Sequence, residues 1–296
     1  PGEDSKYIYV WMDAPVGYLS SIQNWANQND IEYADLMNED NVKLVHFIGK
    51  DIVYFHLLFW PVMLKTYGIN NLDEVFVHGF LTIEGSKMSK SKGNFILADK
   101  ALTFAHPDYY RYYLCSKLNT DISDIDFSVN DFVQKINSDL IGKFINIGSR
   151  TQNFLVKLNS SKVASGNISK SLEFKKNYEE IISLIDRKEY SKALKNIMNI
   201  ADKINAYVST EEPWNKAKNG EEKECIAICS EALNVFKDLT ILLQSFIPSI
   251  ADKIFSLLNA SDLTYDDLGI DNLNEVQKFK PFIARLEKND FDGILD

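Results

Sequence analysis

Three lysines lie within six residues in the segment Gly85–Asn94, which reads GSKMSKSKGN. No carboxylate occurs between Gly85 and Ala98, although acidic side chains outnumber basic ones in the whole chain. The glycines near its two ends let the segment bend and let its backbone approach a ligand closely. Lysine ammonium groups and serine hydroxyls are suited to phosphate oxygens. The segment therefore predicts a phosphate-binding loop, and the alternative for such a lysine run is a solvated basic loop.

The three cysteines, Cys115, Cys225 and Cys229, are the other groups that could react or bind a metal. Cys225 and Cys229 are four residues apart in a helical pattern and share one helix face. No histidine or further cysteine lies near them, so we expect small core residues and no protein metal site in this chain. An odd, low cysteine count argues against a disulfide framework and favours a cytoplasmic protein.

The elements that must position the loop begin with strand-like runs that alternate with helical patterns from Tyr7 to Leu118. Predicted strands cover Tyr7–Met12, Val42–Ile48 and Glu74–Phe80. Asp13 as a cap and Pro15 in the first turn predict a helix start after the first strand. Repeats of this kind indicate a parallel sheet with ligands at the carboxyl ends of its strands. We therefore expect a partial Rossmann-like α/β domain over residues 1–118.

A polar connector, Asn119–Asp124, ends this part of the chain. Strand patterns disappear after Leu118, and from Ser128 onward apolar residues recur at helical spacing. Further helical patterns cover Leu172–Arg187, Tyr190–Val208 and Glu222–Phe246, with a shorter one after Pro248. The second half is thus predicted to be an all-α helical bundle over residues 119–281, and the last segment, 282–296, is expected to pack back on the first half.

Composition narrows the classes of function. The 296 residues are 45% apolar and 25% charged, which is typical of a globular protein with about two domains. The formal net charge of -10 argues against binding nucleic acid through bulk positive charge. It leaves open the recognition of RNA by a few placed side chains. The longest apolar run, Ile52–Leu64, is too short to span a bilayer, so we expect no membrane association.

Five segments together carry a resemblance to a known family. Lys87–Ser91, here called the signature loop, is identical to the signature loop of class I aminoacyl-tRNA synthetases, and the whole chain resembles methionyl-tRNA synthetase. Trp11–Tyr18 and His46–His56 look like the two amino-acid pocket segments of that family. Phe144–Arg150 and Glu212–Trp214 resemble its anticodon-reading elements. Several class I relatives share the loop alone, whereas these segments in this order are specific.

The resemblance implies a reaction with two steps, in which ATP activates methionine to methionyl adenylate and the methionyl group then passes to tRNA(Met). ATP is expected as a substrate, with Mg²⁺ accompanying its triphosphate rather than held in a protein cage. Lys87 and Lys90 are the catalytic candidates, because their positive charges can neutralise the negative charge that develops on the pyrophosphate. Lys90 is the first choice of the two. The other positions implied to bind ATP are Gly49, Asp51, His78, Gly79, Leu81 and Met88.

The implied methionine site needs aromatic and apolar walls with few polar groups, because the substrate side chain is an apolar thioether. Its expected residues are Trp11, Ala14, Pro15, Tyr18, Ile48, Asp51, Ile52, Phe55 and His56. Tyr18 and His56 can offer hydrogen-bond donors to the sulfur, and Asp51 can pair with the substrate ammonium. From the residues alone, His56 and the aromatic side chains could equally be core, and Asp51 could be only a helix cap.

The implied anticodon site combines a helix face with a stacking platform. Asn146 and Arg150 are four residues apart, so they share a helix face and can address base edges. Trp214, which follows Pro213, can stack on a single-stranded base. The helical domain is thus expected to bind tRNA(Met). The alternatives are a core tryptophan and an ordinary polar helix surface.

Two features of the family pattern are absent from this sequence: a His-Ile-Gly-His-like tetrapeptide and a cysteine-rich zinc knuckle. Both precede, in the family, the part that this chain resembles. We therefore expect the chain to be a C-terminal portion that lacks the N-terminal half of the catalytic domain and does not complete the chemistry alone. The alternatives are a non-catalytic tRNA-binding module and another class I synthetase of the valine, leucine or isoleucine type.

Overall fold

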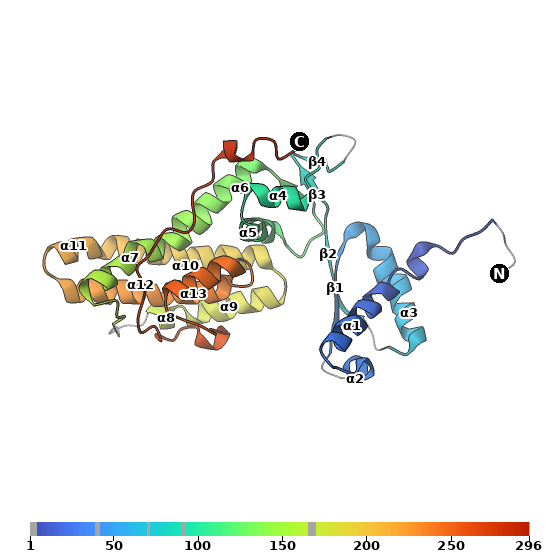
Figure 1. Ribbon diagram of the computed structural model, residues 1–296, viewed down its shortest axis with the longest axis horizontal. Coiled ribbons are helices and arrows are strands. Elements are labelled where there is room, and N and C mark those ends of the chain that lie inside the picture. Colours follow the sequence, from blue (N-terminus) through green and yellow to red (C-terminus); the bar gives the residue numbers. More distant parts are fainter. Residues whose placement is uncertain (1–4, 39–41, 70–71, 90–92, 165–169, 296) are drawn as a thin grey trace. The chain divides into compact units, whose positions relative to one another are not determined.

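Two compact units make up the computed structural model, which describes residues 5–38, 42–69, 72–89, 93–164 and 170–295 (Figure 1). The first unit comprises residues 1–80 and 120–124, and the second comprises residues 81–119 and 125–296. This division differs from the expected domain limit at Leu118, because residues 81–119 pack with the helices that follow them.

A two-stranded parallel sheet organises the first unit. In this sheet β1 (Leu44–Gly49) pairs with β2 (Leu72–His78), which confirms the predicted parallel pairing. The crossover between the strands contains a π-helical turn, Phe55–Phe59, and α3 (Trp60–Tyr67). Two further helices precede β1 in the chain, α1 (Val16–Gln28) and α2 (Tyr33–Asn38).

The predicted strand Tyr7–Met12 is wrong. Val10–Met12 forms a short 3₁₀ helix, and Tyr7 is 94% exposed. A strand requires a neighbour that pairs with its N–H and C=O groups, and no described residue pairs with this run. The predicted helix start is also displaced, since α1 begins at Val16 and Asp13 contributes its main-chain oxygen rather than a side-chain cap.

The second unit begins with a three-stranded sheet in the order β4–β3–β5. Its central strand, β3 (Leu81–Ile83), pairs antiparallel with β4 (Ser86–Lys87) and parallel with β5 (Ile125–Phe127). The expectation that strands end before Leu118 is therefore wrong, because three residues are too few to show a strand period. In the chain, α4 (Ala98–Phe104) and α5 (Pro107–Lys117) lie between β4 and β5.

Helices form most of the rest of the second unit, and the predicted helical bundle is confirmed (Figure 1). Their bounds are α6 (Val129–Lys135), α7 (Asn146–Leu158), α8 (Lys170–Glu173), α9 (Lys175–Asp186), α10 (Tyr190–Glu211), α11 (Pro213–Lys218), α12 (Glu222–Leu243) and α13 (Pro248–Leu257). A π-helical segment, Ile136–Ile145, joins α6 to α7. Buried on nearly every side, α12 is the centre of this core and packs against α7 and α10. Gly148 allows the approach of α7, since an added Cβ there would lie 2.8 Å from the Phe236 ring.

The C-terminal segment returns along the second unit. The Asn137 side-chain amide exchanges two hydrogen bonds with the backbone of Leu286, at 2.7 and 2.9 Å. Further on, the buried ring of Phe291 stacks on Phe104 of α4 and meets Phe132 of α6 edge-on. These contacts fasten the end of the chain to α4 and α6.

No helix in the described part of the chain is long and apolar enough to cross a lipid bilayer. The same residues contain no group of three or more histidine, cysteine or carboxylate side chains that could hold a metal ion.

The three cysteines are free thiols, and Cys225 and Cys229 lie in the core as predicted. Burial raises the pKa of Cys115 to about 11 and also raises the pKa values of Cys225 and Cys229.

Because the thiolate is the reactive form, we expect the three cysteines of the folded chain to resist alkylation by iodoacetamide at neutral pH. Mass spectrometry after brief labelling checks this, with the denatured chain taking up one label per cysteine. Rapid labelling of the native chain would contradict it.

Candidate amino-acid, phosphate and RNA sites

Aromatic rings gather around His56 in the first unit. The Trp11 ring stacks on Phe55, with 4.7 Å between centroids and 6° between planes, and meets His56 edge-on at 5.5 Å. The Tyr18 ring lies 5.8 Å from the His56 ring. The structure thus brings together the four aromatic residues of the expected methionine site, which come from three separate elements of the first unit.

Both ring nitrogens of the fully buried His56 have partners. Its Nδ1 lies 2.9 Å from the main-chain oxygen of Ile52, and its Nε2 lies 2.9 Å from the Tyr18 hydroxyl. A carbonyl oxygen can only accept, so Nδ1 carries the proton of the neutral ring and the Tyr18 hydroxyl donates to Nε2. A thioether sulfur that accepts from Tyr18 must therefore compete with His56 for that proton.

Two residues that the sequence reasoning missed complete the cluster. His46 of β1 and Trp60 of α3 contact the Tyr18 ring, at centroid distances of 4.8 and 6.0 Å. The Trp60 Nε1–H donates to His46 Nε2 at 3.1 Å. A signal for His46 was present, because alternation along a strand places it on the same face as Ile48, and both are buried.

The carboxyl ends of β1 and β2 bring several expected ligand-binding positions together. Gly49 and His78 are register partners across the sheet. Asp51 turns back over Gly49, so that an added Cβ at Gly49 would lie 2.8 Å from Asp51 Oδ1. At the end of β2, an added Cβ at Gly79 would lie 2.1 Å from a main-chain oxygen of the connector 120–124. Gly79 is thus required by a close approach of main chain, whereas at Gly49 the exposed Asp51 side chain could turn aside. Both glycines lie at the sheet edge where parallel sheets bind ligands.

The remaining expected methionine-site residues also lie in the first unit. They are Ala14, Pro15, Ile48 and Ile52, of which Pro15 and Ile48 are buried. Asp51 is exposed, which leaves its carboxylate accessible to a charged group.

The connector 120–124 returns to the first unit through Asp124. Its Oδ1 accepts from Lys50 Nζ at 2.7 Å and from the Phe80 N–H at 2.8 Å. One carboxylate therefore joins the turn after β1 to Phe80, two residues beyond the end of β2.

The described part of the signature loop lies in the second unit. Lys87 in β4 is exposed and pairs with Thr82 of β3, whereas Lys90 lies outside the described residues. The Asn94 side chain accepts from the Ser89 N–H at 2.9 Å and donates to the Lys87 main-chain oxygen at 3.1 Å. One amide thus holds the backbone on both sides of Met88.

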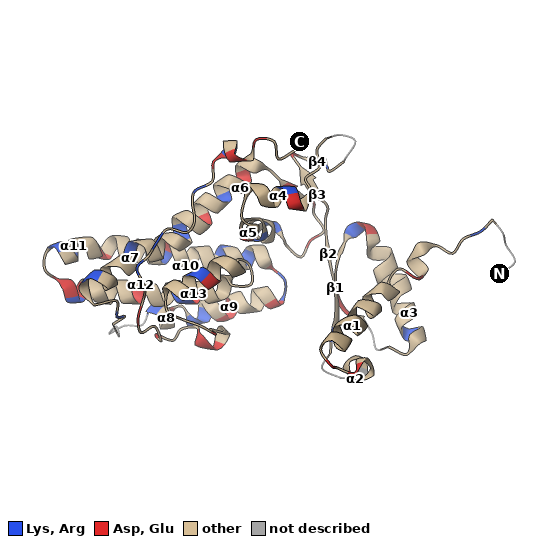
Figure 2. Ribbon diagram, in the orientation of Figure 1, with Lys and Arg blue, Asp and Glu red and all other residues tan. Residues whose placement is uncertain are grey.

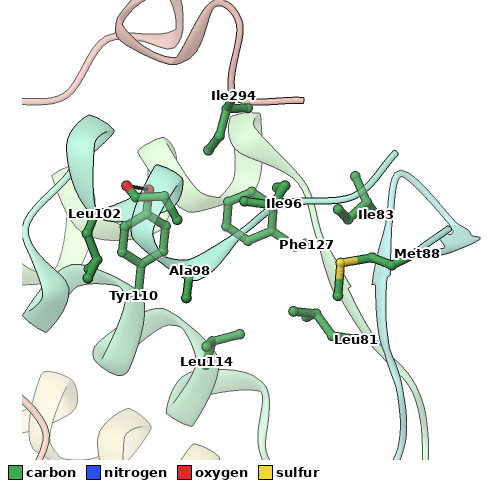
Figure 3. A pocket seen from close by; sticks show the side chains of 11 residues that line it. Leu81, Ile83, Met88, Ile96, Ala98, Leu102, Tyr110, Leu114, Phe127 and Ile294 are labelled. Carbon is green, nitrogen blue, oxygen red and sulfur yellow. Dashed lines mark hydrogen bonds between the residues drawn. The ribbon is translucent and has the colours of Figure 1, made fainter. Parts of the chain in front are cut away.

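An apolar cavity of about 270 Å³ lies beside β3 and the end of β4 (Figure 3). Its lining residues are Leu81, Ile83, Met88, Ile96, Ala98, Ala101, Leu102, Tyr110, Leu114, Phe127 and Ile294. Figure 3 shows the Met88 side chain extending into this cavity from the end of β4. The side chains of Met88 and Leu81, both expected near ATP, therefore face apolar neighbours.

The three expected anticodon residues lie together on the second unit. The Arg150 guanidinium lies 5.1 Å from the centroid of the Trp214 ring, a cation–π contact. Arg150 also donates to Ser209 Oγ at 3.0 Å and to the Asn205 main-chain oxygen at 3.4 Å. Trp214 is 38% exposed, so part of its ring is available for stacking.

Asn205 of α10 orients Asn146, and the sequence reasoning missed it. The Asn205 Nδ2 donates to the main-chain oxygens of Lys143 and Ala201, which can only accept and so fix the direction of this amide. Its Oδ1 then accepts from Asn146 Nδ2 at 3.0 Å. The Asn146 Oδ1 has no partner among the described residues and can accept from a ligand. No spacing rule could reveal this pair, which joins two helices 59 residues apart.

Charges around this cluster are mixed. Beside it Lys143 pairs with Asp202 at 2.7 Å, and basic and acidic residues are interspersed along the helices of the second unit (Figure 2). Recognition of RNA here would therefore depend on placed side chains rather than on a basic field.

Comparison with known protein families gives two matches along the chain. Residues 1–152 match a family described as tRNA synthetases class I (M). Residues 162–288 match a family described as the anticodon binding domain of methionyl tRNA ligase.

Curated relatives are similar over the whole chain. The methionine–tRNA ligases of Ralstonia nicotianae and Francisella tularensis subsp. tularensis are each 40% identical over 303 aligned residues. These alignments cover 100% of this chain but only 44% and 45% of the relatives. The chain thus spans less than half the length of the curated relatives that it matches.

Solved structures show the same likeness. Mycobacterium tuberculosis methionyl-tRNA synthetase in complex with methionyl-adenylate superimposes with a TM-score of 0.81 at 25% identity, over 95% of this chain and 56% of that chain. Its free-state crystal structure gives a TM-score of 0.78 at 22% identity, over 97% of this chain and 57% of that chain, and shows likeness of fold alone.

Proposed function

This chain belongs to the methionyl-tRNA synthetase family, and we propose on that basis that it contributes to methionine activation and to tRNA(Met) recognition. In the proposed reaction the methionine carboxylate attacks the α-phosphate of ATP and releases pyrophosphate. The terminal ribose hydroxyl of tRNA(Met) then attacks the acyl carbon of methionyl adenylate. Mg²⁺ arrives with the triphosphate, which supplies the oxygen ligands that this ion prefers.

The observation that carries this proposal is the aromatic cluster around the Tyr18–His56 hydrogen bond. Its rings offer the polarisable, apolar surroundings that suit a thioether, and sulfur makes favourable contacts with ring edges. The polar pair Tyr18 and His56 distinguishes a thioether from a hydrocarbon side chain. The exposed carboxylate of Asp51, at the edge of the same unit, pairs with the substrate ammonium.

The second unit supplies charge to the phosphates and contacts to the tRNA. Lys87 neutralises negative charge that develops on the pyrophosphate, and Lys90 is proposed to do the same on the strength of the sequence match. Asn146 and Arg150 address base edges, and Trp214 stacks on a base. This assignment is supported by the cation–π contact and the hydrogen bonds that hold the three side chains together.

The first unit carries many exposed apolar side chains. Tyr7, Ile8, Phe47 and Val62 are each more than half exposed. Extensive exposed apolar surface marks a contact with another segment or partner. We propose that residues equivalent to those that the longer relatives carry beyond the matched part cover this surface and complete the catalytic domain.

We expect the 296-residue chain alone to show no methionine-dependent ATP–pyrophosphate exchange, and the complete polypeptide that includes those residues to show it. Radiolabelled pyrophosphate incorporated into ATP measures both. Turnover by the chain alone would contradict the proposed need for a covering segment.

The same assay separates the alternatives. Exchange that depends on valine, leucine or isoleucine instead of methionine would favour another class I synthetase. A complete polypeptide that gives no exchange, yet binds tRNA(Met) more tightly than a tRNA with an altered anticodon, would favour a non-catalytic tRNA-binding module.

A further inference from the structure

We infer that His46 is a positioning residue of the amino-acid site, which holds Trp60 and Tyr18 in the places from which they shape the methionine pocket. The inference rests on the proposed function of the first unit. It assigns a role to a buried group that the proposed reaction does not otherwise use.

The first argument is the position of His46 behind the pocket residues. Its ring centroid lies 4.8 Å from that of Tyr18, 5.4 Å from that of His56 and 6.4 Å from that of Trp60. These three rings come from α1, the π-helical turn and α3. His46 itself lies on β1 and is 8% exposed, so a strand of the sheet supports all three.

The second argument concerns which atoms of the cluster carry the hydrogen-bonding protons. The Trp60 indole can only donate, so His46 Nε2 accepts at 3.1 Å and the proton of the neutral His46 ring is on Nδ1. The Tyr18 hydroxyl in turn donates to His56 Nε2. The two histidines thus present acceptors to the Trp60 indole and to the Tyr18 hydroxyl. Removal of the His46 acceptor leaves a buried indole N–H without its partner, which is costly.

The third argument is that His46 is kept in the accepting form. A doubly protonated ring has no acceptor, and burial, with a second contribution from the neighbouring His56, lowers the His46 pKa. The titratable groups that face His46 are Tyr18 from α1 and His56 from the π-helical turn, and neither is a carboxylate. From α3 the neighbour is Trp60, and from β2 the register partner is Val75, neither of them a charged residue.

A matched pair of variants tests the hydrogen bond in the 296-residue chain. His46→Gln keeps an acceptor and cannot titrate, whereas His46→Leu removes the acceptor. The readout is the indole N–H signal of Trp60 in a ¹⁵N spectrum, assigned by its loss in Trp60→Phe. We expect the signal to move upfield and exchange faster in His46→Leu, and to move on acidification in the wild type but not in His46→Gln. An unchanged Trp60 signal in His46→Leu would overturn the inference.

The complete polypeptide tests the consequence for the substrate. We expect His46→Leu to raise the KM for methionine about tenfold, the order of effect of a buried donor left unpaired, with the KM for ATP unchanged. His46→Gln should restore most of the loss, which a merely space-filling role would not allow. His106→Leu, which removes a histidine of the second unit that caps α5, serves as the control and should leave the KM for methionine unchanged.

The outcomes separate the two proposals. Normal methionine-dependent exchange with an unchanged KM in His46→Leu would overturn the inference alone. A wild-type polypeptide without methionine-dependent exchange would overturn the proposed function and this inference with it.

Discussion

Replacement of Lys87 by alanine in the complete polypeptide is expected to lower methionine-dependent ATP–pyrophosphate exchange by about 10²–10³, the usual cost of losing one preorganised charge donor. The Lys87 side chain is exposed on β4, and its backbone is held by Asn94 and by the pairing with β3. The Lys87 side chain thus extends from a fixed backbone position. Initial rates of exchange at saturating ATP and methionine measure the effect.

Two comparisons sharpen this test. Lys90→Ala is expected to cause at least as large a loss, on the strength of its place in the signature loop. Lys253→Ala removes an exposed lysine from α13 and should leave exchange unchanged. Near-normal exchange in both loop variants would show that the loop does not neutralise the phosphates.

The second large effect is expected at Trp214. Trp214→Ala should lower the aminoacylation efficiency of tRNA(Met) by about tenfold to a hundredfold, because stacking on one base contributes roughly 1–3 kcal/mol. ATP–pyrophosphate exchange, which needs no tRNA, should stay normal. The cation–π contact with Arg150 holds the ring in place, so the lost platform is an ordered one. Charging of tRNA(Met) at limiting tRNA concentration measures the change.

Trp214→Phe is the matched variant here. It keeps a stacking face and a partner for Arg150, so it should retain much more activity than Trp214→Ala. Equal losses of aminoacylation and exchange in Trp214→Ala would mean that Trp214 serves folding instead of tRNA binding.

The helices of the second unit could be predicted because each repeats its apolar positions over several turns. In α10 the buried residues recur at helical spacing, and this local signal needs no knowledge of partners. Strands depend on distant partners, which explains both errors. Tyr7–Met12 has strand composition but no neighbour among the described residues, and β5 gains its neighbour β3 from a distant part of the chain.

The residues of the candidate sites were found where a segment carries its own signal. Tyr18, His56, Arg150 and Trp214 stand in segments whose residue order is distinctive. These residues are oriented by His46 and Asn205, which form hydrogen bonds between separate elements. A local sequence pattern cannot predict such bonds. The distances that join them become visible only once the strands and helices are packed.

The path of the chain through the connector 120–124 has a practical consequence for dissection of this protein. The polypeptide leaves the first unit after Phe80, returns for five residues and leaves again after Asp124. No single cut therefore yields both units whole: a truncation after Asn119 deprives Phe80 and Lys50 of their shared carboxylate, and a product that starts at Thr120 lacks β3 and β4. Separate expression of the two units therefore needs more than one truncation site. It calls for a circularly permuted gene, or for the connector 120–124 to be fused to the end of the first unit.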